Sequence, residues 1–259
     1  MNGDTLLRCD NLAMHFRGLT ALDNLQLDIR EGEILGLLGP NGSGKTTFFN
    51  VVTGIYRASA GHIEFESRDI SKSSPQAIYR AGIARTFQRS RLCLPLTIFD
   101  NIMIGNHRRL NHGLWFNLVS RRRLREQYEA CWQEARELVT IFNKALGTRL
   151  LHAAASVSMI DRRRIEVCRA LVGRPKLLLL DEPSAGMTHE ETHELMDDIL
   201  AIRQRIPHLT IVIIEHGMNV IERITHRCVV LNYGRKICEG TYGEITENAE
   251  VQQAYLGKS

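Results

Sequence analysis

Apolar positions along the chain follow two different periodicities. From Leu6 to about Ile34, apolar and polar residues alternate as they do in half-buried strands, and the same alternation returns from Gly61 to Ile70. Continuous apolar stretches bounded by polar or glycine-rich segments predict buried strands. These stretches are residues 33–38, 177–181, 211–214 and 228–231.

Helical spacing of apolar residues dominates other segments. The sequence from about Pro75 to Leu151 is typical of helix, most clearly from Arg121 to Phe142, which is rich in Arg, Glu, Gln and Ala. Shorter helices are expected from Lys45 to about Gly54, from Asp161 to Val172 and from Glu190 to Arg205. Strands that alternate with helices predict an α/β fold with a parallel sheet. The long helical stretch in the middle then forms an inserted subdomain.

Length and charge restrict the class of protein. With 259 residues, 33 basic and 29 acidic side chains and a net charge of +4, the balance is too mild to indicate nucleic-acid binding by itself. No apolar run approaches the roughly 20 residues that a membrane span needs. The first residues lack a secretory signal, and the six cysteines are scattered without a paired motif. We therefore expect a cytoplasmic chain with reduced cysteines.

A glycine-rich segment carries the strongest chemical signal. It matches G-x-x-x-x-G-K-[ST] between a predicted strand and a predicted helix, the context that a phosphate-binding loop requires. Its residues are Gly39, Pro40, Asn41, Gly42, Ser43, Gly44, Lys45, Thr46 and Thr47. Glycines let successive N–H groups point at phosphate oxygens, and the helix N-terminus adds positive partial charge. We expect Lys45 to contact the phosphates and the Thr46 hydroxyl to bind Mg²⁺.

An acidic pair follows the most apolar of the predicted strands. Leu177 to Leu180 runs directly into Asp181 and Glu182. Beside a phosphate loop, an acid at a strand end can hold the metal, and a second acid can polarise an attacking water. The sequence therefore predicts hydrolysis of a nucleoside triphosphate, with Mg²⁺ as cofactor.

Together with these motifs, the chain resembles the ATP-binding subunits of ABC transporters over nearly its whole length. Gln88, in Gly82 to Gln88, resembles the family's Q-loop glutamine, and His216 resembles the switch histidine that contacts the γ-phosphate. Phe16 occupies the place of an aromatic residue that stacks on adenine. Residues 184–187 occupy the place of the D-loop.

The resemblance implies a complete set of expectations. The fold is a P-loop NTPase: a RecA-like parallel sheet, an antiparallel β region from residues 1–34 and 55–72, and a helical subdomain over about residues 90–160, all in one ABC ATPase domain spanning residues 1–259. ATP and Mg²⁺ are the implied cofactors. The implied catalytic residues are Lys45, Gln88, Glu182 and His216. The implied metal ligands are Thr46, Gln88 and Asp181.

Several motifs resemble importers of branched-chain amino acids and related small amides. They are residues 82–88, residues 96–102, the segment Asn41–Asn50 and the ending Ala254–Gly257. Such a subunit works with integral membrane permease subunits and with a solute-binding protein outside the membrane. The resemblance therefore places the chain as a peripheral protein on the inner face of the cell membrane, with the solute selected by its partners.

One motif departs from the family pattern. The signature resembling Leu-Ser-Gly-Gly-Gln falls on Val157 to Asp161, where only Ser158 matches. In the family this loop contacts the nucleotide bound to the other subunit. A β-branched Ile160 is expected to resist an unusual backbone angle, and Asp161 is expected to oppose a phosphate. Three interpretations stay open: a tolerated variant, a homodimer with slow hydrolysis, and a heterodimer with a second ATPase, which we favour.

An alternative function is a soluble ABC ATPase that acts on DNA or ribosomes. The arginine runs 121–123 and 162–164 are the only basic clusters that suggest it, and no aromatic interleaving accompanies them. Solvated helix faces or contacts with neighbouring subunits explain these runs better. We therefore expect no nucleic-acid partner.

Overall fold

The computed structural model describes residues 4–88, 90–106 and 121–256 and divides the chain into two compact units. The first unit comprises residues up to 85, residues 176–183 and residues from 206 onward. The second comprises residues 86–175 and 184–205. The second unit includes the range 90–160 expected for the helical subdomain and also takes in later helices. Part of that expected range, residues 107–120, lies outside the described residues, as does Gly257 of the ending motif.

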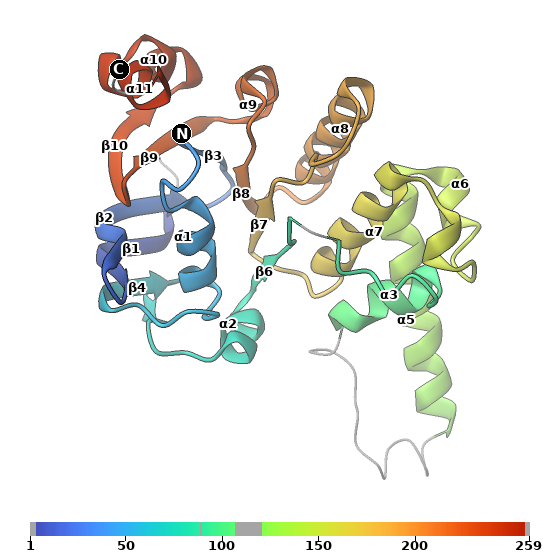
Figure 1. Ribbon diagram of the computed structural model, residues 1–259. Helices are drawn as coiled ribbons and strands as arrows, with labels where there is room; N and C mark the ends of the chain where they lie inside the picture. The colour runs from blue at the N-terminus through green and yellow to red at the C-terminus, as the bar shows by residue number, and fades with distance from the viewer. Residues whose placement is uncertain (1–3, 89, 107–120, 257–259) are drawn as a thin grey trace. The chain divides into compact units, whose positions relative to one another are not determined.

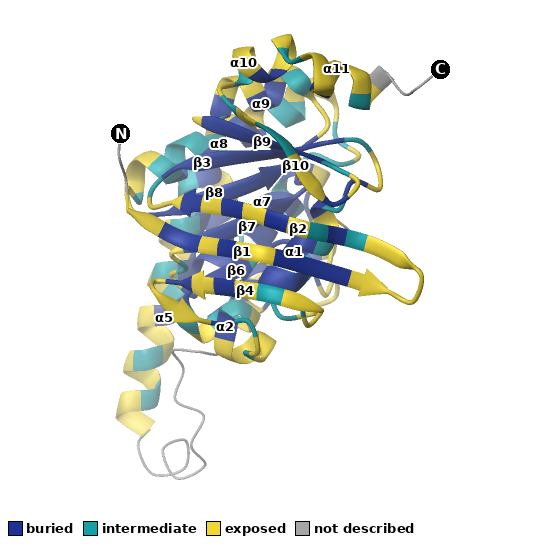
Figure 2. Cartoon of the chain, turned by 90° about the vertical axis from the view of Figure 1, so that its left-hand side faces the viewer, coloured by how far each residue is buried: buried dark blue, intermediate teal, exposed yellow. Residues whose placement is uncertain are grey.

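An antiparallel sheet forms from the first strands of the chain, as predicted. Its order is β2-β1-β4-β5, with β1 at Thr5–Phe16, β2 at Leu19–Arg30, β4 at Ala60–Phe65 and β5 at Arg68–Asp69. Figure 2 shows buried and exposed residues alternating along β1, β2 and β4. One face of this sheet is therefore apolar and must be covered by the rest of the unit.

The second sheet of this unit has the order β10-β9-β3-β8-β7-β6. Its predicted strands are β3 at Ile34–Leu38, β7 at Leu177–Asp181, β8 at Thr210–Ile214 and β9 at Arg227–Asn232. These four strands run parallel, and β3, β7 and β8 are buried along their whole length. Continuous apolar runs are what a sheet that is buried on both faces requires.

Two strands of this sheet were not predicted. β6 at Ile83–Arg85 lies parallel to β7, so the expectation of continuous helix from residue 75 to residue 151 is wrong at this point. β10 at Arg235–Gly240 lies antiparallel to β9 and contains no fully buried residue. Three residues are too few to show a periodicity, and an exposed edge strand shows no apolar run.

The core of the first unit lies between the two sheets. Alternate residues of the parallel strands, such as Leu35 and Leu37 of β3, join the apolar face of the antiparallel sheet and the rings of Phe48 and Phe49. Both rings come from α1, at Lys45–Val52, and both are fully buried. The remaining helices of this unit are α2 at Pro75–Ala81, α9 at Met218–Ile224, α10 at Tyr242–Glu247 and α11 at Ala249–Leu256. Because α1 is anchored in this core, the glycine-rich loop that precedes it is also held in place.

The second unit is helical in its described part (Figure 1). Its helices are α3 at Ile98–Met103, α5 at Arg121–Phe142, α6 at Lys144–Gly147, α7 at Met159–Leu171 and α8 at His189–Arg205, with short turns η1 at Ile104–Asn106 and η2 at Ala154–Ser156. The predicted helices at 121–142, 161–172 and 190–205 are thus found within two residues. None of the helices in the described ranges is long and apolar enough to cross a membrane.

The two arginine runs lie in different surroundings. Residues 121–123 are exposed, as expected for a solvated helix face. Arg163 and Arg164 are instead buried and bonded to carboxylates of their own unit, so the expectation of a solvated face or a subunit contact is wrong for them. These two guanidinium groups are not available to nucleic acid. All six cysteines are unpaired.

Candidate nucleotide site

The carboxyl ends of three neighbouring parallel strands gather most of the predicted residues of the first unit. Gly39 follows β3, Asp181 ends β7 and His216 comes two residues after β8. Strands β3, β8 and β7 are adjacent in that order. Because their carboxyl ends lie at one edge of the sheet, the loops that follow them meet there, at the usual ligand position of an open α/β sheet.

The loop from Gly39 to Gly44 can only be built with glycine at its ends. Gly39 has φ +140°, and a Cβ added there would lie 2.1 Å from the carbonyl oxygen of Leu231. Gly44 has φ +106° and precedes α1 without any side-chain cap. The first amides of α1 therefore have no side-chain acceptor, and their N–H groups and the helix dipole favour an anion.

Lys45 and Ser43 present polar atoms inside this loop. Lys45 is buried, and its Nζ donates to the carbonyl oxygens of Gly39 at 2.7 Å and Pro40 at 3.0 Å. Burial lowers the pKa of Lys45, while the nearby charges of Glu182 and Asp181 act in the opposite direction. The buried Ser43 Oγ has no hydrogen-bond partner. A cation and a hydroxyl held in this way fit the oxygens of a phosphate chain.

Asp181 is held on one side only. Arg85 donates from Nη2 to Oδ2 at 2.6 Å, and both side chains are almost fully buried. Burial raises the pKa of Asp181, and the Arg85 guanidinium acts against that rise. Its Oδ1 is buried and has no hydrogen-bond partner. An unsatisfied carboxylate oxygen beside a phosphate loop fits a magnesium site, with the exposed Thr46 in the first turn of α1 as the other expected ligand.

Glu182 and His216 form a pair at the same edge. Glu182 has φ +46°, which a residue other than glycine adopts only at a cost, and its backbone N–H donates to Ile214 at 2.9 Å. His216 Nε2 lies 3.0 Å from Glu182 Oε1. The strained backbone thus aims a carboxylate at the histidine from the neighbouring strand end. Such a pair can accept a proton from a water molecule and keep the base in place.

Phe16 is the other predicted residue of the first unit. It ends β1, is 36% exposed and stacks edge-on against Tyr56, with ring centroids 5.2 Å apart. An exposed face of an aromatic ring can stack on a base, so the structure leaves this prediction open to test.

Gln88, Ser158 and the segment 184–187 belong to the second unit. Arg163 connects two of them through backbone contacts. Its Nη2 donates to the carbonyl oxygens of Gln88 at 2.9 Å and Ala185 at 3.3 Å, and its Nη1 donates to Glu166 at 2.9 Å. One buried guanidinium thus joins the Q-loop, the signature helix and the D-loop segment.

The signature variant forms an ordinary helix start. Ser158 is the N-cap of α7, and its Oγ accepts from the backbone N–H of Asp161 at 3.3 Å. Met159 and Ile160 lie within the helix and have negative φ, in agreement with the expectation that Ile160 resists an unusual backbone angle. Asp161 binds Arg164 at 3.0 Å and accepts a hydrogen bond from Asn143 at 3.3 Å. Its charge is thus balanced locally, and its opposition to a phosphate remains a prediction.

Sequence reasoning missed two residues at the phosphate loop. Arg85 precedes the Q-loop, and its pairing with Asp181 depends on a strand that was not predicted. Tyr255 accepts a hydrogen bond from the backbone N–H of Gly39 at 2.8 Å through its hydroxyl oxygen. Tyr255 belongs to the ending Ala254–Gly257, which stands out in the sequence for its resemblance to the family. Nothing in the sequence, however, connects this ending to a loop 216 residues away. A groove of about 480 Å³ lies beside the loop, between residues 40–43 and helix α11.

Comparison with known proteins identifies the family of the chain. The profile of the family described as ABC transporter matches residues 22–185, and that of the branched-chain amino acid ATP-binding cassette transporter matches residues 235–259. The high-affinity branched-chain amino acid transport ATP-binding protein LivG of Salmonella typhimurium is 38% identical over 257 residues, covering 98% of each chain. BraF of Pseudomonas aeruginosa, of the same description, is 35% identical over 260 residues, again covering 98% of each chain.

Solved structures show the same fold. A nucleotide-free ATP-binding cassette from an ABC transporter has a TM-score of 0.84 and 26% identity, covering 98% of this chain and 100% of the other. An ATP-binding cassette of an ABC transporter in its ADP conformation gives 0.83 and 26%, with the same coverage. The fold is that of a P-loop ATPase of the cassette type.

The chain belongs to the ABC transporter family, whose profile matches more than half of its length. It is an ATP-binding and ATP-hydrolysing transporter subunit, and its full-length relatives are proteins of branched-chain amino acid transport. The alternative of a soluble ABC ATPase that acts on nucleic acid or ribosomes is not favoured by any of these similarities.

Proposed function

We propose that this chain hydrolyses ATP at the inner face of the cell membrane to drive import of branched-chain amino acids or related small amides. The observation that carries the proposal is the convergence of the phosphate loop, Asp181, Glu182 and His216 at one sheet edge, in a chain similar over its whole length to LivG and BraF.

The residues divide the chemistry between them. Lys45, Ser43 and the first amides of α1 bind the phosphate chain. Asp181 and Thr46 hold Mg²⁺, which neutralises charge on the phosphates when it is bound. Glu182 accepts the proton of the attacking water, and His216 fixes the carboxylate by the contact at 3.0 Å.

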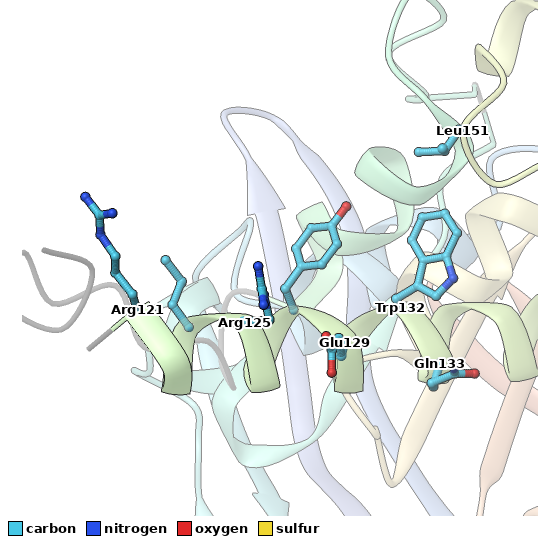
Figure 3. A pocket seen from close by; sticks show the side chains of 8 residues that line it. Arg121, Arg125, Glu129, Trp132, Gln133 and Leu151 are labelled. Atoms are coloured by element: carbon cyan, nitrogen blue, oxygen red, sulfur yellow. The ribbon is translucent and has the colours of Figure 1, made fainter. Parts of the chain in front are cut away.

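The second unit carries a surface suited to the permease. A hollow of about 930 Å³ on α5 is lined by apolar side chains, among them Tyr128, and by charged and polar ones. Figure 3 shows Trp132 and Leu151 beside it, together with Arg125 and Glu129. Tyr128 is 54% exposed and Leu151 is 66% exposed. Exposed apolar groups that gather in one hollow are typical of a protein contact. We assign this hollow to a segment of the permease.

Substitution at the hollow tests this assignment. Leu151→Asp is expected to reduce co-purification with the permease subunits, while ATP binding by the chain stays as in the wild type. Leu19→Asp is the matched control, because Leu19 is equally exposed but lies in the antiparallel sheet of the first unit. Equal recovery of the permease with both variants would contradict the assignment.

The signature variant supports a heterodimer. In the family, each nucleotide lies between the phosphate loop of one subunit and the signature of the other. Because this chain has an intact loop and a degenerate signature, a second ATPase subunit with an intact signature completes one good site. ATP hydrolysis by this chain alone should be slow and should rise on mixing with that subunit. Full activity of the isolated chain would exclude the heterodimer.

Uptake by the intact complex tests the function as a whole. The complex is purified from membranes with its permease and solute-binding protein and placed in liposomes. The liposomes are prepared with and without ATP inside, where the ATPase subunits of the correctly oriented complexes lie. Labelled leucine, isoleucine and valine are offered outside. We expect ATP-dependent accumulation. Robust ATP hydrolysis without accumulation of these solutes would exclude the proposed solute class but would leave the ATPase role intact.

A further inference from the structure

Two histidines stand one helical turn apart at the start of α8. His189 and His193 occupy positions i and i+4, so their side chains lie on one helix face. Their ring centroids are 4.4 Å apart, and the two Nε2 atoms are 3.3 Å apart. The two nitrogens share a hydrogen bond, so one of them carries the proton. His189 is exposed and His193 is partly exposed, so the pair is open to solvent.

The separation of the two nitrogens matches a metal site. Zn²⁺ binds imidazole nitrogen at about 2.0–2.1 Å with tetrahedral angles, which places two such ligands about 3.3 Å apart. The observed 3.3 Å equals this chord. A cation could therefore bind both nitrogens without a change in the helix backbone, by replacing the shared proton and with a small rotation of the two rings.

The donor atoms define the class of cation. Imidazole suits Zn²⁺, Cu²⁺ and Ni²⁺, whereas Mg²⁺ and Ca²⁺ prefer oxygen ligands. We propose that His189 and His193 form a two-histidine site for a late first-row divalent cation, separate from the nucleotide site. Water supplies the remaining ligands.

The local sequence His-Glu-Glu-Thr-His also matches the zinc peptidase pattern H-E-x-x-H, with Glu190 in the place of the catalytic base. A catalytic zinc site needs three protein ligands and an open fourth position. Within the ranges that the structure describes, no group of three or more His, Cys, Asp or Glu side chains is placed to hold a metal. The pair is therefore a binding site without peptidase chemistry.

The charge around the pair is mixed. The N-terminus of a helix carries positive partial charge, which opposes a cation. Two carboxylates in the first turn, Glu190 and Glu191, act against that charge. Glu191 also caps the helix, because its carboxylate accepts from the backbone N–H of Thr188 at 3.0 Å. The helix start is thus stabilised independently of any metal, and the histidines are free of that role.

Metal titration of the untagged full chain tests the proposal, with Zn²⁺ alone as the probe. Thiols are first blocked by alkylation, because exposed Cys93 also binds soft metals. Calorimetry should show one equivalent in the wild type, with affinity about tenfold or more weaker in His189→Asn and in His193→Asn. His208→Asn, at an exposed histidine outside α8, is the matched control and should bind as the wild type does.

A second measurement identifies the ligands. Cu²⁺ added to the wild-type chain should give an electron paramagnetic resonance spectrum with two equatorial nitrogen ligands, and the spectrum should change in both single variants. Equal Zn²⁺ binding by the wild type and by the double variant would overturn the proposal. Loss of binding in His208→Asn would do so as well.

Discussion

Arg85 binds one oxygen of Asp181 and leaves the other without a partner. The guanidinium also donates to Asn50 Oδ1 at 2.6 Å and lies over the ring of Phe49, 5.3 Å from its centroid. It thereby connects β6, the end of β7 and α1. An arginine in this position keeps Asp181 in one orientation, with Oδ1 on the side of the expected cation.

Removal of the Arg85 guanidinium should affect both the stability of the chain and its response to Mg²⁺. Arg85→Met leaves a buried carboxylate without its partner, which costs about 3–5 kcal/mol of the free energy of unfolding. In the variant that remains folded, the Mg²⁺ concentration needed for half-maximal ATP binding should rise. Urea unfolding and nucleotide titration at several Mg²⁺ concentrations measure the two effects.

Arg85→Lys is the conservative comparison, because lysine keeps the charge but loses the two-pronged geometry. We expect it to recover part of the stability and part of the Mg²⁺ response. A Met variant with wild-type stability and wild-type Mg²⁺ dependence would contradict the role given to Arg85.

At the residue scale, local motifs were sufficient for Lys45, Asp181 and Glu182, since each lies next to a strand or helix that the sequence itself indicates. Arg85 and Tyr255 were missed because their partners are distant in sequence, and a single chain does not encode such pairings in any local pattern. The structure places all of these residues, but their roles in binding and hydrolysis, like those of Gln88, Phe16, His216 and Ser158, remain predictions.

The signature segment at the start of helix α7 departs from the family sequence but still forms a regular helix start. Ser158 caps the helix, and Asp161 joins the carboxylates that surround the buried Arg164. The segment therefore folds as a regular helix start even though it has lost the family's glycines. Its catalytic competence is a separate question from its folding.

Ser158→Ala should destabilise the chain even without nucleotide. Loss of an N-cap hydroxyl costs about 1 kcal/mol, because the backbone N–H of Asp161 loses its acceptor. Ser158→Thr keeps the acceptor and should remain within a few tenths of a kcal/mol of the wild type. Urea unfolding measures both. An Ala variant as stable as the Thr variant would show that the cap contributes nothing.

The contact between α7 and α8 should respond to pH. Burial raises the pKa of Asp198 to about 6, with Glu194 and Asp197 adding to the rise and Arg164 opposing it. Because the folded state binds this proton more tightly than the unfolded chain does, the contribution to stability is present at low pH and is lost as pH rises through about 6.

Asp198→Asn removes this titration. Between about pH 4 and pH 7, the free energy of unfolding of the wild type should fall relative to that of the variant, by about 1–2 kcal/mol. Denaturant unfolding across this range measures the difference, with Asp10→Asn, at an exposed position of β1, as a control. Parallel curves for the wild type and Asp198→Asn would contradict the assignment.

Elements with long runs were predictable, and short or exposed ones were not. The buried strands β3, β7 and β8 have continuous apolar runs, and α5 has 22 residues of helical spacing. β6 has three residues and β10 lies at a sheet edge, so neither carries enough pattern to show its conformation. In both cases pairing with a neighbour, rather than local preference, decides the structure.

At the scale of the whole molecule, the chain has the nucleotide chemistry in one unit and the signature, Q-loop and D-loop segments in the other. Within the second unit, Arg163 joins the Q-loop and D-loop segments. The sequence predicted both the α/β core and the helical insertion. The solute and the partner subunits are set by other chains, so no pattern in this sequence encodes them.

Phosphate release by Glu182→Gln tests the central claim most directly, namely that this sheet edge hydrolyses ATP through Glu182. The assay uses the complete complex, with Glu247→Gln, at an exposed site in α10, as the matched control. We predict that Glu182→Gln binds ATP as the wild type does but releases phosphate at least about 100-fold more slowly. The control should release phosphate at the wild-type rate. Wild-type phosphate release by Glu182→Gln would contradict the account.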